Sequence, residues 1–182
     1  MKLRLLASSL ALLLLSACTG IPKGLAPVQG FEIDRYLGQW HEIARLDHSF
    51  ERGLIDVSAT YSPREDGGIR VLNRGYDPER GQWKEVEGRA YFLDGPQTAS
   101  LKVSFFGPFY GGYHVIALDR ENYRHALVSG PSREYLWILA RERELPAKTL
   151  ASLVAQARQA GFPVDRLIYV KHRESGPNAP LK

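Results

Sequence analysis

Eight short runs of alternating polar and apolar residues are the strongest constraint on how this chain folds. The runs are rich in β-branched and aromatic residues, and the stretches between them contain the Gly, Pro, Asp or Asn that tight turns require. Eight strands in hairpin order predict an all-β fold, an eight-stranded antiparallel up-and-down barrel with room for one small ligand. The predicted strands are residues 39–46, 56–62, 69–75, 83–92, 100–106, 112–118, 124–129 and 135–141.

The segment after the eighth run has a different period. In "PAKTLASLVAQARQAGF", apolar residues recur at helical spacing, from Leu150 through Leu153 and Val154 to Ala157. Pro146 opens the segment, and a glycine closes it, as is typical of helix ends. A last short run, "RLIYV", follows. We therefore expect a C-terminal α-helix and a short final strand beside the barrel.

The first seventeen residues have the organisation of an export signal. Lys2 and Arg4 precede a mostly apolar run over residues 5–15, and the small residues Ser16 and Ala17 follow it. The run is too short to cross a bilayer, because a spanning helix needs about 20 apolar residues. Residues 1–17 are therefore predicted to be a signal peptide.

The only cysteine of the chain, Cys18, directly follows this leader. The stretch Leu15-Ser16-Ala17-Cys18 resembles the lipobox of bacterial lipoproteins, which implies that Cys18 is diacylated and becomes the first mature residue. In that family's sorting, the absence of Asp after the cysteine favours the outer membrane, and Thr19 stands there. The alternative is an ordinary signal peptide with a cysteine beside its cleavage site. A disulfide is not an explanation, because there is no second cysteine.

Composition divides the rest of the chain. Residues 18–30 contain several glycines and prolines, which predicts an extended lipidated tether, and residues 174–182 read as a flexible tail. Residues 31–173 remain as one barrel domain. The formal charge of +4 includes Lys2 and Arg4 of the leader, so the mature chain is only mildly basic. No cluster of Lys and Arg predicts a nucleic-acid partner.

Two local patterns, about a hundred residues apart, resemble those of the lipocalin family. Gly38-Gln39-Trp40 in "YLGQWHEIAR" matches the Gly-x-Trp at the start of the first lipocalin strand, and Arg141 in "YLWILAR" matches the arginine that ends the eighth. With the eight strands and the trailing helix, they make residues 31–173 similar to a bacterial outer-membrane lipocalin. The stretch "KVSFFGPFYGGYHVIALD" resembles that bacterial branch in particular.

The hairpin order brings these patterns together at one end of the barrel. If the first strand runs from the closed end to the open end, the eighth must finish at the closed end. Trp40 and Arg141 then meet there, where a guanidinium can stack on an indole, and with Gly38 they are expected to be structural. Asp119 and Tyr123, a partial match to the family's second motif, fall at the same end.

Alternation of side chains indicates which residues face the barrel interior, once Trp40 and Arg141 are taken as inward. The small residues among them leave space that suits an acyl chain. The same alternation directs Ala117 inward. The alternative is a barrel packed solid, without a cavity. The candidate ligand-binding residues are Ala59, Tyr61, Val71, Asn73, Val103, Phe105, Tyr113, Val115, Val128, Tyr135 and Trp137.

The stretch "FFGPFYGG" places three aromatic residues at the open mouth, Phe106, Phe109 and Tyr110. Exposed aromatic side chains at a rim are suited to contact with a ligand, a bilayer surface or a second subunit. The sequence leaves these three open, including a homodimer.

The stretch "HEIARLDHSFE" gathers His41, Glu42, Asp47, His48 and Glu51, which raises the question of a metal site or a catalytic centre. The His-Glu-x-x-His spacing is absent, and adjacent strand residues face opposite sides of the sheet. We therefore predict no metal site and no cofactor. Glu42 is predicted to face inward, where a buried carboxylate needs a partner.

No catalytic site is predicted elsewhere. Ser129 in "VSGPS" lacks the Gly-x-Ser-x-Gly of a nucleophile elbow. The resemblance implies a protein that stores or transports fatty acids or (lyso)phospholipids for membrane maintenance. It would be lipid-anchored in the outer membrane, with its barrel on the periplasmic side. A barrel enzyme acting on an apolar substrate and a structural envelope lipoprotein without ligand are the alternatives.

Overall fold

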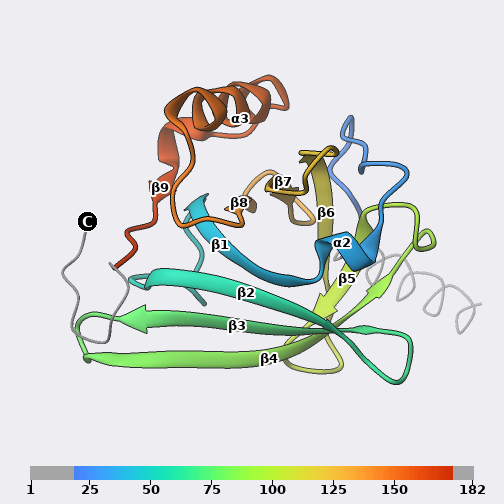
Figure 1. The fold of residues 1–182 in the computed structure, drawn as a ribbon, viewed down its shortest axis with the longest axis horizontal. Helices are drawn as coiled ribbons and strands as arrows, with labels where there is room; N and C mark the ends of the chain where they lie inside the picture. Colours follow the sequence, from blue (N-terminus) through green and yellow to red (C-terminus); the bar gives the residue numbers. More distant parts are fainter. Residues whose placement is uncertain (1–18, 174–182) are drawn as a thin grey trace, which may run out of the picture.

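The protein is described by a computed structural model that covers residues 19–173 (Figure 1). The predicted signal peptide, Cys18 and the predicted tail lie outside these residues. The helical elements are α2 (Ile33–Tyr36), α3 (Ala147–Gln159) and the 3-10 helix η1 (Val164–Arg166). The strands are β1 (Gly38–Arg45), β2 (Ile55–Pro63), β3 (Ile69–Asp77), β4 (Gln82–Phe92), β5 (Ser100–Ser104), β6 (Gly111–Leu118), β7 (His125–Ser129), β8 (Leu136–Ala140) and β9 (Ile168–Tyr169).

Strands β1 to β8 form one closed antiparallel barrel. Each strand pairs with its neighbour in the chain, and β1 closes the ring by pairing with both β8 and β2. Closure leaves no unpaired barrel edge. The predicted fold is confirmed, and each predicted strand agrees with the structure to within two residues at either end. The loops 46–54, 78–81, 105–110 and 130–135 lie at the open end.

Irregular register changes the face of residues in two strands. In β1 the register shifts between Glu42 and Ala44, so Arg45 turns into the barrel. In β6 the shift lies between Val115 and Ala117. Ala117 therefore packs outside the barrel, under the C-terminal helix, and its predicted inward orientation is wrong. Strict alternation fails at such bulges because one extra residue reverses every side chain after it.

Helix α3 packs against the outer wall of the barrel, and this covers the faces of β1, β7 and β8 (Figure 1). Its residues Leu153 and Ala157 are buried against a second apolar cluster that includes Leu127 and Ile138. The chain then reaches β9, which pairs with the end of β1. The predicted helix and short final strand are both present.

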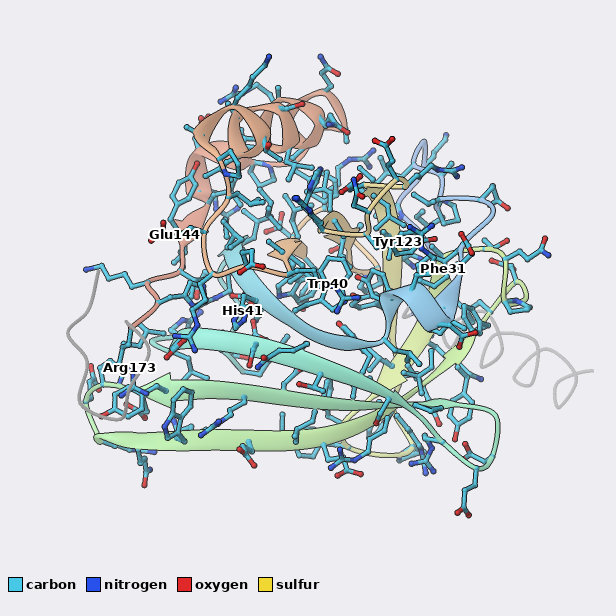
Figure 2. All side chains as sticks on the ribbon, viewed as in Figure 1. Phe31, Trp40, His41, Tyr123, Glu144 and Arg173 are labelled. Atoms are coloured by element: carbon cyan, nitrogen blue, oxygen red, sulfur yellow. The ribbon has the colours of Figure 1, made fainter. Side chains whose placement is uncertain are left out.

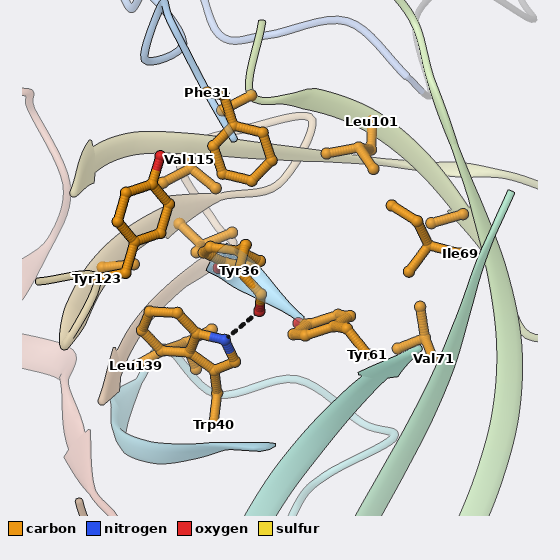
Figure 3. Close-up of a cluster of buried hydrophobic side chains, with 14 residues drawn as sticks. Phe31, Tyr36, Trp40, Tyr61, Ile69, Val71, Leu101, Val115, Tyr123 and Leu139 are labelled. Carbon is orange, nitrogen blue, oxygen red and sulfur yellow. Dashed lines mark hydrogen bonds between the residues drawn. The ribbon is translucent and has the colours of Figure 1, made fainter. Parts of the chain in front are cut away.

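The closed end of the barrel is plugged by aromatic side chains (Figure 3). Helix α2 was not predicted from the sequence. It places the ring of Tyr36 beside two others, with 4.6 Å between the ring centres of Tyr36 and Trp40 and 5.1 Å between those of Tyr36 and Phe31. Tyr123 completes the group. Four residues are too few for a periodic pattern to show, so α2 carries no helical signal in the sequence.

Residues 19–30 pack along the barrel, in contrast to the extended tether that their composition predicted. The backbone N–H of Val28 donates to the carbonyl of Val115 at 2.8 Å, and the N–H of Ala99 donates to the carbonyl of Val28 at 2.9 Å. Arg133 donates to the carbonyl of Lys23. These bonds hold the segment in place although its side chains are mostly small or polar.

The end of the described chain is pinned to the outside of β1 and β2. Buried Asp56 lies 3.2 Å from His172 and 3.4 Å from both Arg143 and Arg173. His172 also bonds to the carbonyl of Glu42 at 2.8 Å. Figure 2 shows Arg173 at the end of the barrel opposite Phe31 and Tyr123.

Candidate functional site

The closed end is held by the guanidinium of Arg141. It lies 4.1 Å from the centre of the Trp40 ring, and it donates hydrogen bonds to the carbonyls of Gln39, Arg35 and Tyr123 at 2.8, 2.8 and 3.3 Å. This is the contact that the hairpin order predicted. Trp40 is fully buried and donates through Nε1 to the carbonyl of Tyr36 at 2.8 Å (Figure 3).

Gly38 is favoured beside this arginine by its backbone conformation. Its φ of +91° lies in a region that residues with a side chain rarely adopt, whereas a Cβ atom there would be in ordinary contact with Nη1 of Arg141, at 3.4 Å. The motif residues thus join the start of β1, the end of β8 and the turn before β7 into one structural unit.

A continuous apolar cavity runs from the aromatic plug to the open mouth. Its inner part begins at Phe31, Ile33 and Tyr36, and its outer part ends among the loops at the open end. Residues such as Val57, Asn73, Phe105 and Trp137 line both parts, so the two are connected. The barrel is therefore not packed solid.

Most of the predicted ligand-binding residues line this cavity. The exceptions are Val115 and Val128, which are fully buried in the packed core and do not reach the cavity surface. Tyr135 lines only the mouth. The reason is the aromatic plug, which fills the closed half of the barrel where the sequence left its extent open. The predicted residues that line the inner cavity are Ala59, Tyr61, Val71, Asn73, Val103, Phe105, Tyr113 and Trp137.

Three tyrosines supply neutral hydrogen-bond donors inside the cavity. The hydroxyl of Tyr113 lies 2.7 Å from that of Tyr36 and 2.9 Å from that of Tyr61. Burial raises the pKa of all three, so they stay protonated. Three hydroxyl protons serve two hydrogen bonds, so among the described residues one proton has no acceptor and is available to a ligand.

A buried group of charges forms one side of the wall. Arg45 donates from Nη1 to Glu42 Oε1 at 2.7 Å, and from Nη2 to the backbone carbonyl of Glu51 at 2.9 Å. Trp137 donates to Glu51 Oε2 at 3.3 Å. Both glutamates line the cavity. The sequence predicted that Glu42 faces inward and needs a partner. It could not identify Arg45 as that partner, because the bulge in β1 changes the face on which Arg45 lies.

The histidines near these residues do not form a metal site. Burial lowers the pKa of both His41 and His48 to about 4, so both are neutral at neutral pH. His41 faces outward toward His172, and its ring lies 5.6 Å from that ring. Within residues 19–173, no three His, Cys, Asp or Glu side chains lie close enough together to hold a metal ion.

The rim of the mouth carries unusually exposed aromatic rings. Phe106 and Phe109 in the β5–β6 loop are 75% and 78% exposed, and Phe50 in the β1–β2 loop is also exposed. The third predicted rim residue, Tyr110, is held at the wall by Arg89 and Lys102.

The first described residue lies beside the same loop. A Cβ atom on Gly112, at the start of β6, would lie 2.9 Å from the carbonyl oxygen of Thr19, so glycine permits this close approach. Thr19 directly follows the candidate lipid-attachment residue Cys18 in the sequence, and Cys18 itself lies outside the described residues. In the described part of the chain, no helix combines the length and the hydropathy needed to cross a membrane.

Comparison with known proteins agrees with this geometry. The lipocalin-like domain family matches residues 31–172. An outer membrane lipoprotein Blc of Vibrio cholerae is 55% identical over 160 residues, which cover 88% of this chain and 94% of that protein. The Blc of Escherichia coli K12 is 54% identical over 171 residues, 93% of this chain and 96% of its own.

Among solved structures, insecticyanin from the tobacco hornworm Manduca sexta superposes with a TM-score of 0.68 at 19% identity, covering 89% of this chain and 97% of that one. At this identity the likeness concerns the fold alone. The family domain and the two bacterial relatives span nearly the whole barrel with its Gly-x-Trp and its arginine, and the chain is therefore a bacterial outer-membrane lipocalin.

Proposed function

We propose that this lipocalin binds one long-chain lipid, a fatty acid or a (lyso)phospholipid, and stores or transports it for maintenance of the outer membrane. The observation that carries the proposal is the continuous apolar cavity, open at one end and closed by aromatic rings at the other. Burial of each methylene contributes about 0.8 kcal/mol, so a 16-carbon chain supplies on the order of 10 kcal/mol before ordering costs.

The position of the N-terminus supports an anchored carrier whose mouth faces the bilayer. Acylation of Cys18 would place lipid chains next to Thr19, which contacts the start of β6 beside the mouth. The exposed rings of Phe106 and Phe109 lie on the adjoining loop. Aromatic rings of this kind partition favourably into the interfacial region of a membrane.

A cavity-filling substitution tests the lumen as the binding site. Ala59 lines the cavity between Trp40 on β1 and Asn73 on β3. Ala59→Phe should weaken binding of palmitic acid at least about ten-fold, because the added ring would occupy lumen volume that the acyl chain needs. Its neighbour Thr60 faces the other side of the sheet, so Thr60→Phe is the matched control and should bind like the wild type. Equal binding by both variants would place the ligand elsewhere.

Tryptophan fluorescence provides the measurement. Trp137 lines the cavity, whereas Trp40 is buried in the plug and Trp83 stacks on Arg74 at the outer wall. Palmitic acid should change the fluorescence saturably at one ligand per barrel, and Trp137→Phe should lose most of the signal while keeping most of the affinity. If extracted lipid is recovered chemically altered after incubation, the protein is an enzyme and the carrier proposal fails.

The anchor is tested separately by Cys18→Ser. The variant should no longer fractionate with membranes, and only the wild-type N-terminal peptide should carry acyl mass. Membrane retention of the variant, together with an unmodified wild-type peptide, would exclude lipid attachment at this residue.

A further inference from the structure

The wall of the cavity contains an ionisable cluster that a simple container for apolar chains does not need. Glu42, Arg45 and Glu51 are each less than 8% exposed, and both carboxyl groups line the lumen. The two carboxyl groups interact electrostatically with each other, and Nη1 of Arg45 lies 2.7 Å from Oε1 of Glu42. Replacing a buried ion group by apolar residues is often neutral or stabilising, so stability alone does not account for this cluster.

Burial favours a protonated carboxyl in this cluster, because two carboxyl groups share one cationic partner, Arg45. Burial raises the pKa of Glu42 and of Glu51, and the neighbouring negative charge of Glu51 raises that of Glu42 further. One shared proton leaves one negative charge on the pair, which the positive charge of Arg45 balances. The other titratable groups that face the pair are His48, which is neutral because burial lowers its pKa to about 4, and Tyr61 of β2, which is protonated.

Polar atoms around the pair are left without partners. His48 is 6% exposed, and its Nε2 lies 3.4 Å from Oε2 of Glu51, yet neither of its ring nitrogens makes a hydrogen bond among the described residues. Nε of Arg45 is also unpaired. Buried polar groups without partners cost free energy, and these atoms belong to residues beside the carboxyl pair, which itself lines the lumen.

The geometry points to the Glu42–Glu51 pair as a recognition site for a primary ammonium group carried on a long apolar chain, which binds there as the shared proton leaves to solvent. This inference rests on the proposed function, because it names the chemistry of the ligand in the same lumen. The charge count supports an ammonium. One positive charge replaces one proton, and the group made of Arg45, two carboxylates and the ammonium remains neutral. An ammonium also has three donors, which match the acceptor oxygens that the two carboxylates present.

A carboxylate head is excluded from this position by the same count. It would add one uncompensated negative charge beside Glu51 in a buried site, which is strongly unfavourable. The mouth offers a different environment, because it opens to solvent and its Lys84 and Arg74 are already paired with Asp77 and Glu85. An anionic head group is therefore expected to stay at the mouth, with only its chain in the barrel.

Three ligands of equal chain length test the inference on the full-length protein. Dodecylamine, 1-dodecanol and dodecanoic acid are titrated by calorimetry at pH 7, each in phosphate and in Tris, whose ionisation enthalpies differ. Dodecylamine should bind about ten-fold or more tightly than dodecanol, as expected for a charged hydrogen bond in a desolvated site. Its heat should differ between the buffers by the amount for release of about one proton, whereas dodecanol should release none.

Variants assign the effect to the pair. Glu42→Gln keeps the size of the side chain but cannot exchange the proton, so it should abolish both the preference for dodecylamine over dodecanol and the proton release. Glu87→Gln is the matched control, because Glu87 pairs with Arg70 on the outer wall at 2.7 Å and should change neither.

The wild-type measurements decide the matter even if Glu42→Gln fails to fold. The inference is overturned if dodecylamine binds no more tightly than dodecanol, or if its binding releases no proton. In that case the carrier proposal stands as long as dodecanol or dodecanoic acid binds at one per barrel. If none of the three binds, both proposals fall.

Discussion

The stack of Arg141 on Trp40 offers a quantitative test of how the closed end is stabilised. Trp40→Leu removes the aromatic face and the Nε1 donor of the Tyr36 carbonyl, and it leaves part of a fully buried ring volume empty. This should cost about 2–4 kcal/mol of unfolding free energy. Arg141→Met keeps the apolar stem and loses three hydrogen bonds to backbone carbonyls, of which water replaces a part, for about 1–3 kcal/mol.

The double variant isolates the contact itself. A guanidinium 4.1 Å from the centre of a buried indole, but itself half-buried, should contribute about 1 kcal/mol through the cation–π interaction. Trp40→Leu/Arg141→Met should therefore be less destabilised than the sum of the single variants by about that amount. Equilibrium urea unfolding of the ligand-free protein, followed by circular dichroism, measures each value.

A second pair serves as the control. Trp83 on β4 stacks on Arg74, whose guanidinium carbon lies 3.9 Å from the centre of the Trp83 ring. Trp83 has no contact with Arg141, so the losses of unfolding free energy in Trp83→Leu and Arg141→Met should be additive. If the Trp40 pair is additive to within about 0.4 kcal/mol, the two residues contribute independently and the reasoning about the closed end is refuted.

Three further predictions concern other parts of the wall. Since the pKa values of His41 and His48 are lowered to about 4, the unfolded chain binds more protons between pH 4 and 6.5. The free energy of unfolding should therefore fall as the pH falls through that window. His41→Gln should reduce the slope of unfolding free energy against pH by up to about 1.4 kcal/mol per pH unit. An unchanged slope would contradict the assignment of the lowered pKa to His41. Gly88→Ala should cost about 1–3 kcal/mol in urea unfolding, because the new Cβ would lie 2.7 Å from the ring of Phe105; a neutral result would show that the ring can move. Arg45→Met should lower stability by about 3–5 kcal/mol in thermal and urea unfolding by leaving the carboxyl pair unpaired, and a loss below 1 kcal/mol would mean that the cluster is already solvated.

The barrel could be predicted from the sequence because its signals are local. Turn residues such as those in "YDPERG" mark where each hairpin reverses, and alternation marks the faces of the regular strands. Trp40 and Arg141 are about a hundred residues apart in the sequence. They could be paired because the up-and-down order places the start of the first strand and the end of the eighth at the same end of the barrel.

The predictions that failed depend on contacts between distant parts of the chain. The bulge in β6 turned Ala117 outward, against its predicted orientation, and the bulge in β1 turned Arg45 inward, for which no orientation had been predicted. Neither strand carries a glycine or proline at the irregular position that would have marked it. Glu51 reaches the lumen from a loop, where alternation gives no orientation. The polar, glycine-rich residues 19–30 read as a free tether, since their order comes from backbone bonds to partners such as Val115.

For the proposed lipid-anchored carrier, the contact between Thr19 and the start of β6 has a consequence for the rate of lipid exchange. A carrier released into the aqueous space must pull the whole chain through water, and for a 16-carbon chain the barrier grows by about 0.8 kcal/mol for each methylene exposed. With an acyl group on Cys18, the mouth stays within reach of the bilayer surface, so a chain can leave one apolar phase while it enters the other. Search for the next lipid then takes place by lateral diffusion in two dimensions, and the residence time of a lipid is set by the few methylenes exposed at once rather than by the length of its chain.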